Sequence, residues 1–145
     1  MFKHILIPTD GSDLSRKAIL YGVQLAKESG AKVTGLTVVE PYRSAGMDTV
    51  FIPIEQGDYE EQSRVLSEKA MEQVKMAANA AGVLCETVSE VLDQPYRAII
   101  DAAQALGCDL IVMASHGRRG ISALLLGSET AKVLTHSTIP VLVYR

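Results

Sequence analysis

The sequence contains little cysteine, no long uncharged run and no large excess of one charge. Its two cysteines, Cys85 and Cys108, lie too far apart for a CxxC redox pair and are too few for a secreted disulfide framework. No Cys and His residues have the spacing of zinc ligands, and this cysteine usage favours a reducing compartment. With 14 Lys and Arg against 17 Asp and Glu, the formal charge of −3 excludes a basic nucleic-acid tail and a polybasic membrane patch.

Hydrophobic segments are also short. The longest stretch without Asp, Glu, Lys or Arg covers residues 133–144, which is less than the roughly 18 to 20 apolar residues of a membrane span. Near the amino end, Asp10 follows too soon for the apolar region of a signal peptide. We therefore expect a cytoplasmic protein that neither spans a membrane nor binds nucleic acid.

The chain has the size and composition of one folded domain. It has 145 residues, of which 48% are hydrophobic. A chain of this length buries roughly two-thirds of its unfolded surface, so it needs neither disulfides nor a structural metal. No internal repeat or low-complexity segment appears, and we expect a single domain over residues 1–145.

Strand-like and helix-like segments alternate along the chain. Short apolar runs predict five strands, at residues 5–7, 33–39, 83–92, 110–113 and 139–143. A 3.6-residue apolar period predicts the intervening helices, which start near Ser12 or Asp13, Asp58, Pro95 and Ser128. Residues 40–57 carry Pro and Gly with little periodicity and predict a long surface connection. The alternation predicts an α/β fold, a five-stranded parallel doubly wound sheet with helices on both faces.

A binding site in such a sheet is expected beyond the carboxyl ends of the strands, near the point where the strand order reverses. Three segments follow strands in this way, at residues 8–12, 38–40 and 114–120. Gly127 and Ser128 begin the last helix, where free backbone N–H groups bind phosphate. Ser128 is equally a plain N-cap, and Arg118 and Arg119 are either phosphate partners or solvated surface.

These residues resemble the universal stress protein family over essentially the whole chain. The resemblance includes the opening residues 5–12 and the closing residues 140–143. The nucleotide-binding branch of that family carries Gly, two residues, Gly, nine residues, Gly, and then Ser or Thr. The same spacing is present here, with Ala114 in place of the first glycine, followed by Gly117, Gly127 and Ser128.

The resemblance implies an adenine nucleotide ligand, ATP or else AMP or ADP, with Mg²⁺ or Mn²⁺. It places Asp10 at the phosphates or their metal, Val38 against the adenine, and Gly117, Gly127 and Ser128 at the ribose and phosphates. The other implied contacts are Pro8, Thr9, Met113, Ala114, His116, Arg118, Glu129 and Thr130.

Each of these roles has a structural alternative. Asp10 and Gly11 also fit a turn that positions the first helix, Val38 fits ordinary strand core, and His116 fits a solvent-facing loop. The cost of Ala114 depends on its backbone. A positive φ or a close ligand contact would penalise its Cβ, whereas a strand-like φ would not.

The implied function is a small regulatory nucleotide-binding module that acts as a homodimer in stress response. The dimer would form by antiparallel pairing of the last strand, which begins at Ile139 and ends at Val143. Alternatives are a slow ATP-hydrolysing or nucleotidyl-transferring enzyme, and a family member that has lost ATP and acts through protein contacts. A two-component receiver fits poorly, because Asp10 and Asp13 match its acidic pair only loosely. An α/β-hydrolase fits less well, because no GxSxG motif is present.

Overall fold

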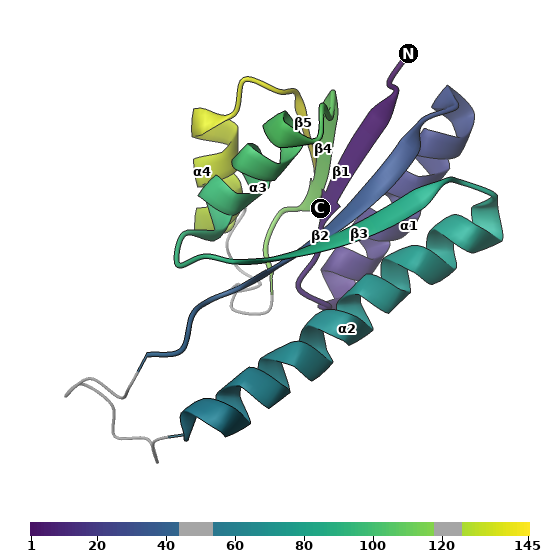
Figure 1. Cartoon of the computed structure of the whole chain (residues 1–145). Helices are drawn as coiled ribbons and strands as arrows, with labels where there is room; N and C mark the ends of the chain where they lie inside the picture. The colour runs from purple at the N-terminus through teal and green to yellow at the C-terminus, as the bar shows by residue number, and fades with distance from the viewer. Residues whose placement is uncertain (44–53, 118–125) are drawn as a thin grey trace.

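The computed structural model describes residues 1–43, 54–117 and 126–145, in which strands and helices alternate along the chain (Figure 1). The strands are β1 (His4–Pro8), β2 (Lys32–Val39), β3 (Cys85–Val91), β4 (Leu110–Ala114) and β5 (Val141–Tyr144). The helices are α1 (Asp13–Ser29), α2 (Gln56–Ala81), α3 (Pro95–Ala105) and α4 (Ser128–His136). None of the helices in this part of the chain is both long enough and apolar enough to span a membrane.

The strands form one sheet in the order β3-β2-β1-β4-β5, and every neighbouring pair is parallel. The chain therefore moves outward from β1 to β3, crosses back to β4, and then moves outward in the other direction. The strand order reverses beside β1, where the loops after β1 and β4 leave the sheet on diverging paths. This arrangement confirms the predicted parallel α/β sheet.

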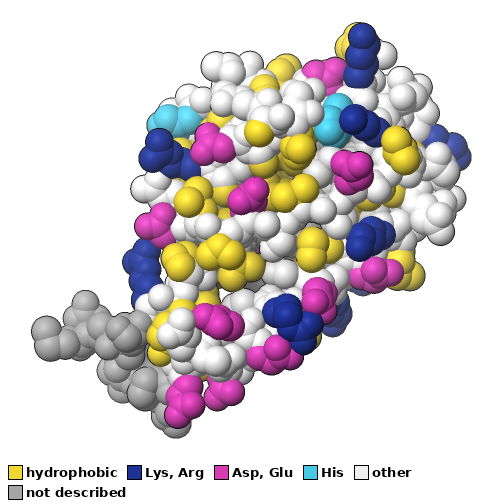
Figure 2. All heavy atoms as spheres, viewed as in Figure 1, with side chains coloured by type: hydrophobic (Ala, Val, Ile, Leu, Met, Phe, Trp, Pro, Cys, Tyr) yellow, Lys and Arg dark blue, Asp and Glu magenta, His cyan; other side chains and the backbone are white. Residues whose placement is uncertain are grey.

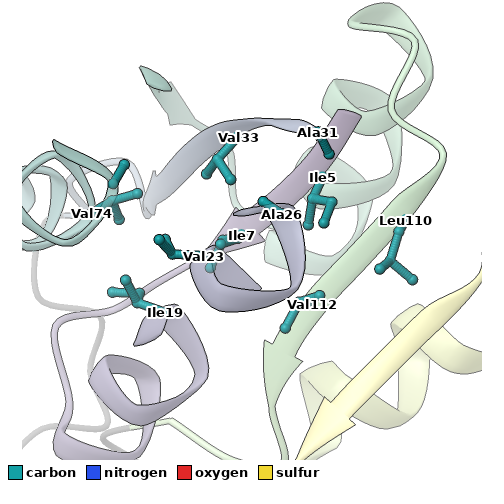
Figure 3. Close-up of a cluster of buried hydrophobic side chains, with 11 residues drawn as sticks. Ile5, Ile7, Ile19, Val23, Ala26, Ala31, Val33, Val74, Leu110 and Val112 are labelled. Carbon is teal, nitrogen blue, oxygen red and sulfur yellow. The ribbon is translucent and has the colours of Figure 1, made fainter. Parts of the chain in front are cut away.

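Helices cover both faces of the sheet, as predicted. On one face, Val23 of α1 and Val74 of α2 belong to one buried cluster with Ile7 of β1, Val33 of β2 and Val112 of β4 (Figure 3). On the other face, α3 and α4 pack on β1, β2 and β4; this cluster includes Leu6, Leu36, Ile99, Ile111 and Val133. Alternate residues of β1 thus enter opposite clusters, as the two-residue period of a strand requires.

The helix ends agree with the sequence prediction at α1 and differ at α4. The Ser12 hydroxyl accepts a hydrogen bond from the Ser15 N–H at 3.2 Å and caps α1, and Gly30 ends that helix at φ 69°. The alternative in which Ser128 caps α4 is wrong, because the N-cap is Gly127 and Ser128 is already the first helical residue.

Two predicted segments differ from the structure for local reasons. The last strand begins at Val141, not at Ile139, because the Ser137 hydroxyl bonds both the N–H and the carbonyl of Ile139 and holds it in a turn. In α2, the apolar period of the sequence predicts Val65 and Leu66 on the buried stripe, but both are exposed; the buried residues are Ala70, Val74 and Ala78. Of the predicted connection at residues 40–57, residues 44–53 lie outside the described part.

Charges of both signs are mixed on the surface. Figure 2 shows Lys and Arg side chains interspersed with Asp and Glu on the viewed face. The described ion pairs are exposed and lie mostly within helices, as between Arg64 and both Glu61 and Glu68. Such pairs contribute little to stability.

A buried histidine lies at the amino end of β1. His4 is 5% exposed, and its Nε2 lies 2.8 Å from the Thr34 hydroxyl of β2. Burial and the nearby charge of Lys32 lower the pKa of His4 below its ordinary value of 6.5, against opposing effects of the Leu106 backbone, Asp109 and Glu86. The Asp109 carboxylate accepts hydrogen bonds from the backbone N–H groups of His4 and Lys3 and so fixes the start of the strand.

This histidine predicts a loss of stability on mild acidification. Above pH 6.5 the ring is neutral in both the folded and the unfolded chain. As the pH falls below 6.5, the unfolded chain binds a proton that the folded chain resists, so stability falls until the pH passes the lowered folded-state pKa. We expect urea denaturation at about pH 7.5 and about pH 5.5 to show a larger loss for the native chain than for His4→Gln. An equal loss in both would contradict this role, and His136→Gln, at an exposed histidine, is the matched control.

Candidate functional site

A cavity of about 580 Å³, here called the main cleft, lies at the carboxyl ends of β1, β2 and β4. It occupies the position that the reversal of strand order predicts. The structure brings together around it twelve of the residues singled out from the sequence: Pro8, Thr9, Asp10, Val38, Met113, Ala114, His116, Gly117, Gly127, Ser128, Glu129 and Thr130. The thirteenth, Arg118, lies outside the described residues.

The turn after β1 presents Asp10 to the main cleft. Its Oδ1 accepts hydrogen bonds from the Ser12 N–H at 2.9 Å and from the Ser15 hydroxyl at 2.8 Å. The predicted turn that positions the first helix is therefore present, with Gly11 at φ 80°. Asp10 therefore has both positions that the sequence offered as alternatives: its carboxylate anchors α1 and also borders the main cleft.

Gly117 lies directly against the Asp10 carboxylate. A Cβ built on Gly117 would overlap Asp10 Oδ2, so any larger residue there must displace the carboxylate. Gly127 is similarly close to backbone, because its Cβ would lie 3.2 Å from both the Cα of His116 and the carbonyl oxygen of Ser115. A side chain at either position would therefore force one of these neighbours to move.

Ala114 occupies an ordinary strand position. It is the last residue of β4, pairs with Tyr144 of β5, and is 7% exposed. Among the described residues, none other than glycine has a positive φ. The backbone at this position therefore accepts alanine without strain, which answers the backbone part of the question that the sequence left open.

Thr130 holds α4 against the end of β4. Its buried hydroxyl donates a hydrogen bond of 2.9 Å to the Ala114 carbonyl oxygen. The Gly127 N–H donates at 2.7 Å to the Ser115 carbonyl oxygen and closes the loop that leaves β4. These two bonds fix the N-terminus of α4 beside the main cleft, so Thr130 is a positioning residue in this structure.

The N-terminus of α4 has the properties of an anion site. Its N-cap is Gly127, whose lack of a side chain leaves no side-chain hydrogen bond at the cap. The first backbone N–H groups of a helix have no partner within the helix, and the helix dipole favours negative charge at this end. Here Ser128, Glu129 and Thr130 carry these groups and line the main cleft. The arrangement suits a phosphate group.

Glu129 has a structural partner. Its Oε2 accepts a hydrogen bond from the Tyr96 N–H at 2.9 Å, near the start of α3, and its Oε1 lies 3.4 Å from Lys132 Nζ. The carboxylate therefore caps a second helix, where the N-cap Gln94 supplies no side-chain hydrogen bond. This contact connects the α4 N-terminus to α3.

The far end of the main cleft is mostly apolar and partly formed by α2. Leu36, Val38 and Met113 line it, together with Ile99 of α3. Sequence reasoning missed the contribution of α2, which consists of Tyr59, Ser63, Leu66, Ser67 and Ala70. The available signal was the hydroxyl-bearing series at positions 59, 63 and 67, because a four-residue spacing places side chains on one face of a helix.

The described lining of the main cleft carries negative charge. Asp10, Glu40 and Glu129 contribute carboxylates, and no Lys or Arg belongs to the lining within the part of the chain that the structure describes. The same part contains no cluster of three or more His, Cys, Asp or Glu residues able to hold a metal ion. A divalent cation at Asp10 would therefore need further oxygen ligands from a bound phosphate.

A buried hydroxyl of β2 lacks a partner. Thr37, 3% exposed, follows Gly35 on the face of β2 that packs against Val74 of α2, and its Oγ1 has no hydrogen bond among the described residues. An unpaired buried hydroxyl costs free energy that an isosteric methyl does not. Thr34, on the same strand, instead has its hydroxyl 2.8 Å from His4 Nε2.

We therefore expect opposite effects from two matched substitutions in β2. Thr37→Val should leave the free energy of unfolding unchanged or raise it by up to about 1 kcal/mol, since no hydrogen bond is lost. Thr34→Val should lower it by about 1 to 2 kcal/mol, because it leaves the buried His4 ring without its partner. Urea denaturation measures both values, and a loss for Thr37→Val as large as that for Thr34→Val would show that the Thr37 hydroxyl is paired.

Comparison with known sequences assigns the chain to a family. The model of the universal stress protein family matches residues 1–145. A universal stress protein of Methanocaldococcus jannaschii is 35% identical over 149 residues, which cover 100% of this chain and 83% of the relative. The universal stress protein YxiE of Bacillus subtilis is 36% identical over 153 residues, which cover 100% of each chain.

Solved structures of the same family share the fold. UspA from Lactobacillus plantarum superposes with a TM-score of 0.81 at 27% identity, over 99% of this chain and 97% of that one. A universal stress protein in complex with cAMP gives a TM-score of 0.72 at 26% identity, again over 99% and 97%. A match over every residue and relatives above 30% identity lead to one conclusion: the chain belongs to the universal stress protein family.

Proposed function

We propose that this chain is an adenine-nucleotide-binding regulatory protein of stress response, and that the main cleft is its nucleotide site. One observation carries the proposal: residues from β1, β2, β4 and α4 that match the nucleotide-binding pattern surround a single cleft. The solved relative in complex with cAMP supports an adenine nucleotide as the ligand class. The phosphate would lie at the uncapped N-terminus of α4, and the base between Val38 and Met113.

The largest ligand that we propose for the main cleft is ATP with Mg²⁺ or Mn²⁺. Three carboxylates border the main cleft, so a bare triphosphate would be repelled. A divalent cation shared between Asp10 and the phosphate oxygens would remove that repulsion. AMP carries less charge and would depend less on the cation.

A titration series tests the proposal. We expect purified protein to bind AMP, and to bind ATP about ten-fold more tightly with Mg²⁺ than without it. Gly117→Ala should weaken binding of ATP with Mg²⁺ by about ten-fold, because the new Cβ displaces the Asp10 carboxylate. Isothermal titration calorimetry on protein freed of bound nucleotide gives these affinities.

Ala114→Gly, at the end of β4, is the matched control. Its affinity should stay within about two-fold of the native value, since Ala114 lies in a strand without strain. Absence of binding by native protein to both AMP and ATP would refute the nucleotide site. Binding that appears only in Ala114→Gly would mean that this family member has lost its nucleotide through one methyl group.

We also propose a homodimer through the exposed edge of β5. All four residues of β5 are half-buried, and β5 pairs with β4 on one side only. The carbonyls of Pro140 and Tyr144 accept hydrogen bonds from the N–H groups of Ile111 in β4 and of Ser115 just after it. By alternation, Val141 and Val143 direct their backbone groups outward. An apolar edge strand with outward N–H and C=O groups pairs readily with a second copy.

Proline at Val143 tests this dimer selectively. It removes an outward N–H without removing a hydrogen bond to β4. We expect sedimentation to give about twice the 15.6 kDa chain mass for native protein and a monomer for Val143→Pro, because pairing of the edge is lost. A native monomer at high concentration, or a variant that stays dimeric, would exclude β5 as the interface. Circular dichroism confirms that the variant is folded.

A further inference from the structure

The inner face of α2 changes character along its length. From Ala70 onward the face is small and apolar; Ala70, Val74 and Ala78 are each at most 2% exposed. Toward the N-terminus the same face carries Ser67, Ser63 and Tyr59, all partly exposed. Figure 1 shows the N-terminal end of this long helix extending beyond the sheet. The C-terminal half of α2 therefore packs on the core, and its N-terminal half borders open space.

That open space includes a second cavity of about 630 Å³, here called the side cavity. It lies between the N-terminal half of α2 and the ends of β2 and β3. The side cavity adjoins the main cleft, because five residues line both: Val39, Glu40, Tyr59, Ser63 and Ser67. The Tyr59 hydroxyl donates a hydrogen bond of 2.6 Å to the Glu40 carbonyl oxygen and ties α2 to the end of β2.

The sheet order places the side cavity at the end remote from the phosphate site. Ser89 and Val91 of β3 line the side cavity, and no described residue of β4 or α4 does. β3 lies three strands from β4, which is roughly 14 Å at the usual spacing of strands. A nucleotide with its phosphate at α4 and its base between Val38 of β2 and Met113 of β4 would have the outer edge of the base near the carboxyl end of β2. Beyond that end, Val39 and Glu40 border the side cavity. In adenine this edge carries the exocyclic N6 amino group, opposite the ribose.

We propose that the side cavity receives a substituent on the outer edge of the base, so that the ligand class includes N6-substituted adenine nucleotides. This proposal rests on the proposed function, because the phosphate position sets the direction of the base. The shared border offers little obstruction, since Ser63 and Ser67 are small and their hydroxyls have no hydrogen-bond partner among the described residues. They are available to the substituent as donors.

The lining of the side cavity defines the substituent. Val39, Met71 and Val91 supply apolar surface, and the serine hydroxyls supply polar contacts. The charged groups are the carboxylates of Glu40, Glu60 and Glu68, and one guanidinium, that of Arg64. Arg64 is already paired with Glu61 and Glu68, at 2.5 and 2.7 Å. A neutral or cationic group with apolar surface fits this lining, and an anionic group does not.

Ser89 allows the side cavity to be filled without altering the main cleft. It lies on β3, lines only the side cavity, and is exposed. Ser89→Phe places a ring in the side cavity at a position where a strand accepts aromatic residues. Ser89→Ala removes the hydroxyl and leaves the space open, and is the matched control.

Calorimetric titration of AMP and N6-benzyl-AMP into the three proteins tests the proposal. Native protein and Ser89→Ala should bind N6-benzyl-AMP at least as tightly as AMP, because the benzyl group buries apolar surface. Ser89→Phe should keep its AMP affinity within about two-fold and lose about ten-fold or more for N6-benzyl-AMP.

Two failures are distinguishable. Native protein that binds AMP but rejects N6-benzyl-AMP, or Ser89→Phe that binds both equally, would overturn the side-cavity proposal and leave the nucleotide site intact. Native protein that binds neither ligand would overturn the proposed function itself, and the side-cavity proposal with it.

Discussion

The parallel pairing of β1 with both β2 and β4 is the interaction on which the rest of the structure depends. All five residues of β1 are buried; Ile5 and Ile7 enter the hydrophobic cluster of one face of the sheet, and Leu6 enters that of the other. Because the chain leaves β1 in one direction and returns to β4 on its other side, two loops diverge from the middle of the sheet. The main cleft lies where they separate.

Two helices that begin at this edge satisfy their N-termini in different ways. α1 is capped by Ser12 and anchored by Asp10, so its first N–H groups are partly used within the protein. α4 begins at Gly127 without a side-chain cap, and Thr130 and Glu129 fix its position through β4 and α3. The backbone of Ser115 and His116 packs closely on Gly127, and no side chain caps the helix. Together these features leave the polar N-terminus of α4 beside the main cleft.

The sequence predicts most of this arrangement, because the signals are local. Strand runs, the Ser12 cap and the glycine spacing each depend on residues near one another in the chain, and twelve predicted residues line one cleft. The hydrogen bond of the Thr130 hydroxyl depends on tertiary packing, and so does the position of α2 beside the main cleft, although the spacing of Tyr59, Ser63 and Ser67 was a local signal for its polar face. The sequence could not show whether φ is positive at Ala114; the backbone of the structure was needed for that. The start of β5 depends on the turn around Ser137, which the sequence pattern did not indicate.

The central claim is that a nucleotide lies across the carboxyl edge of the sheet with its phosphate at α4. Amide chemical shifts of ¹⁵N-labelled protein titrated with AMP test it most directly. The account predicts the largest shifts at the Ser128 and Glu129 amides, at the phosphate end, and at Val38 and Val39, at the base end. Shifts confined to the opposite edge of the sheet, around His4, or no shifts at all, would contradict it.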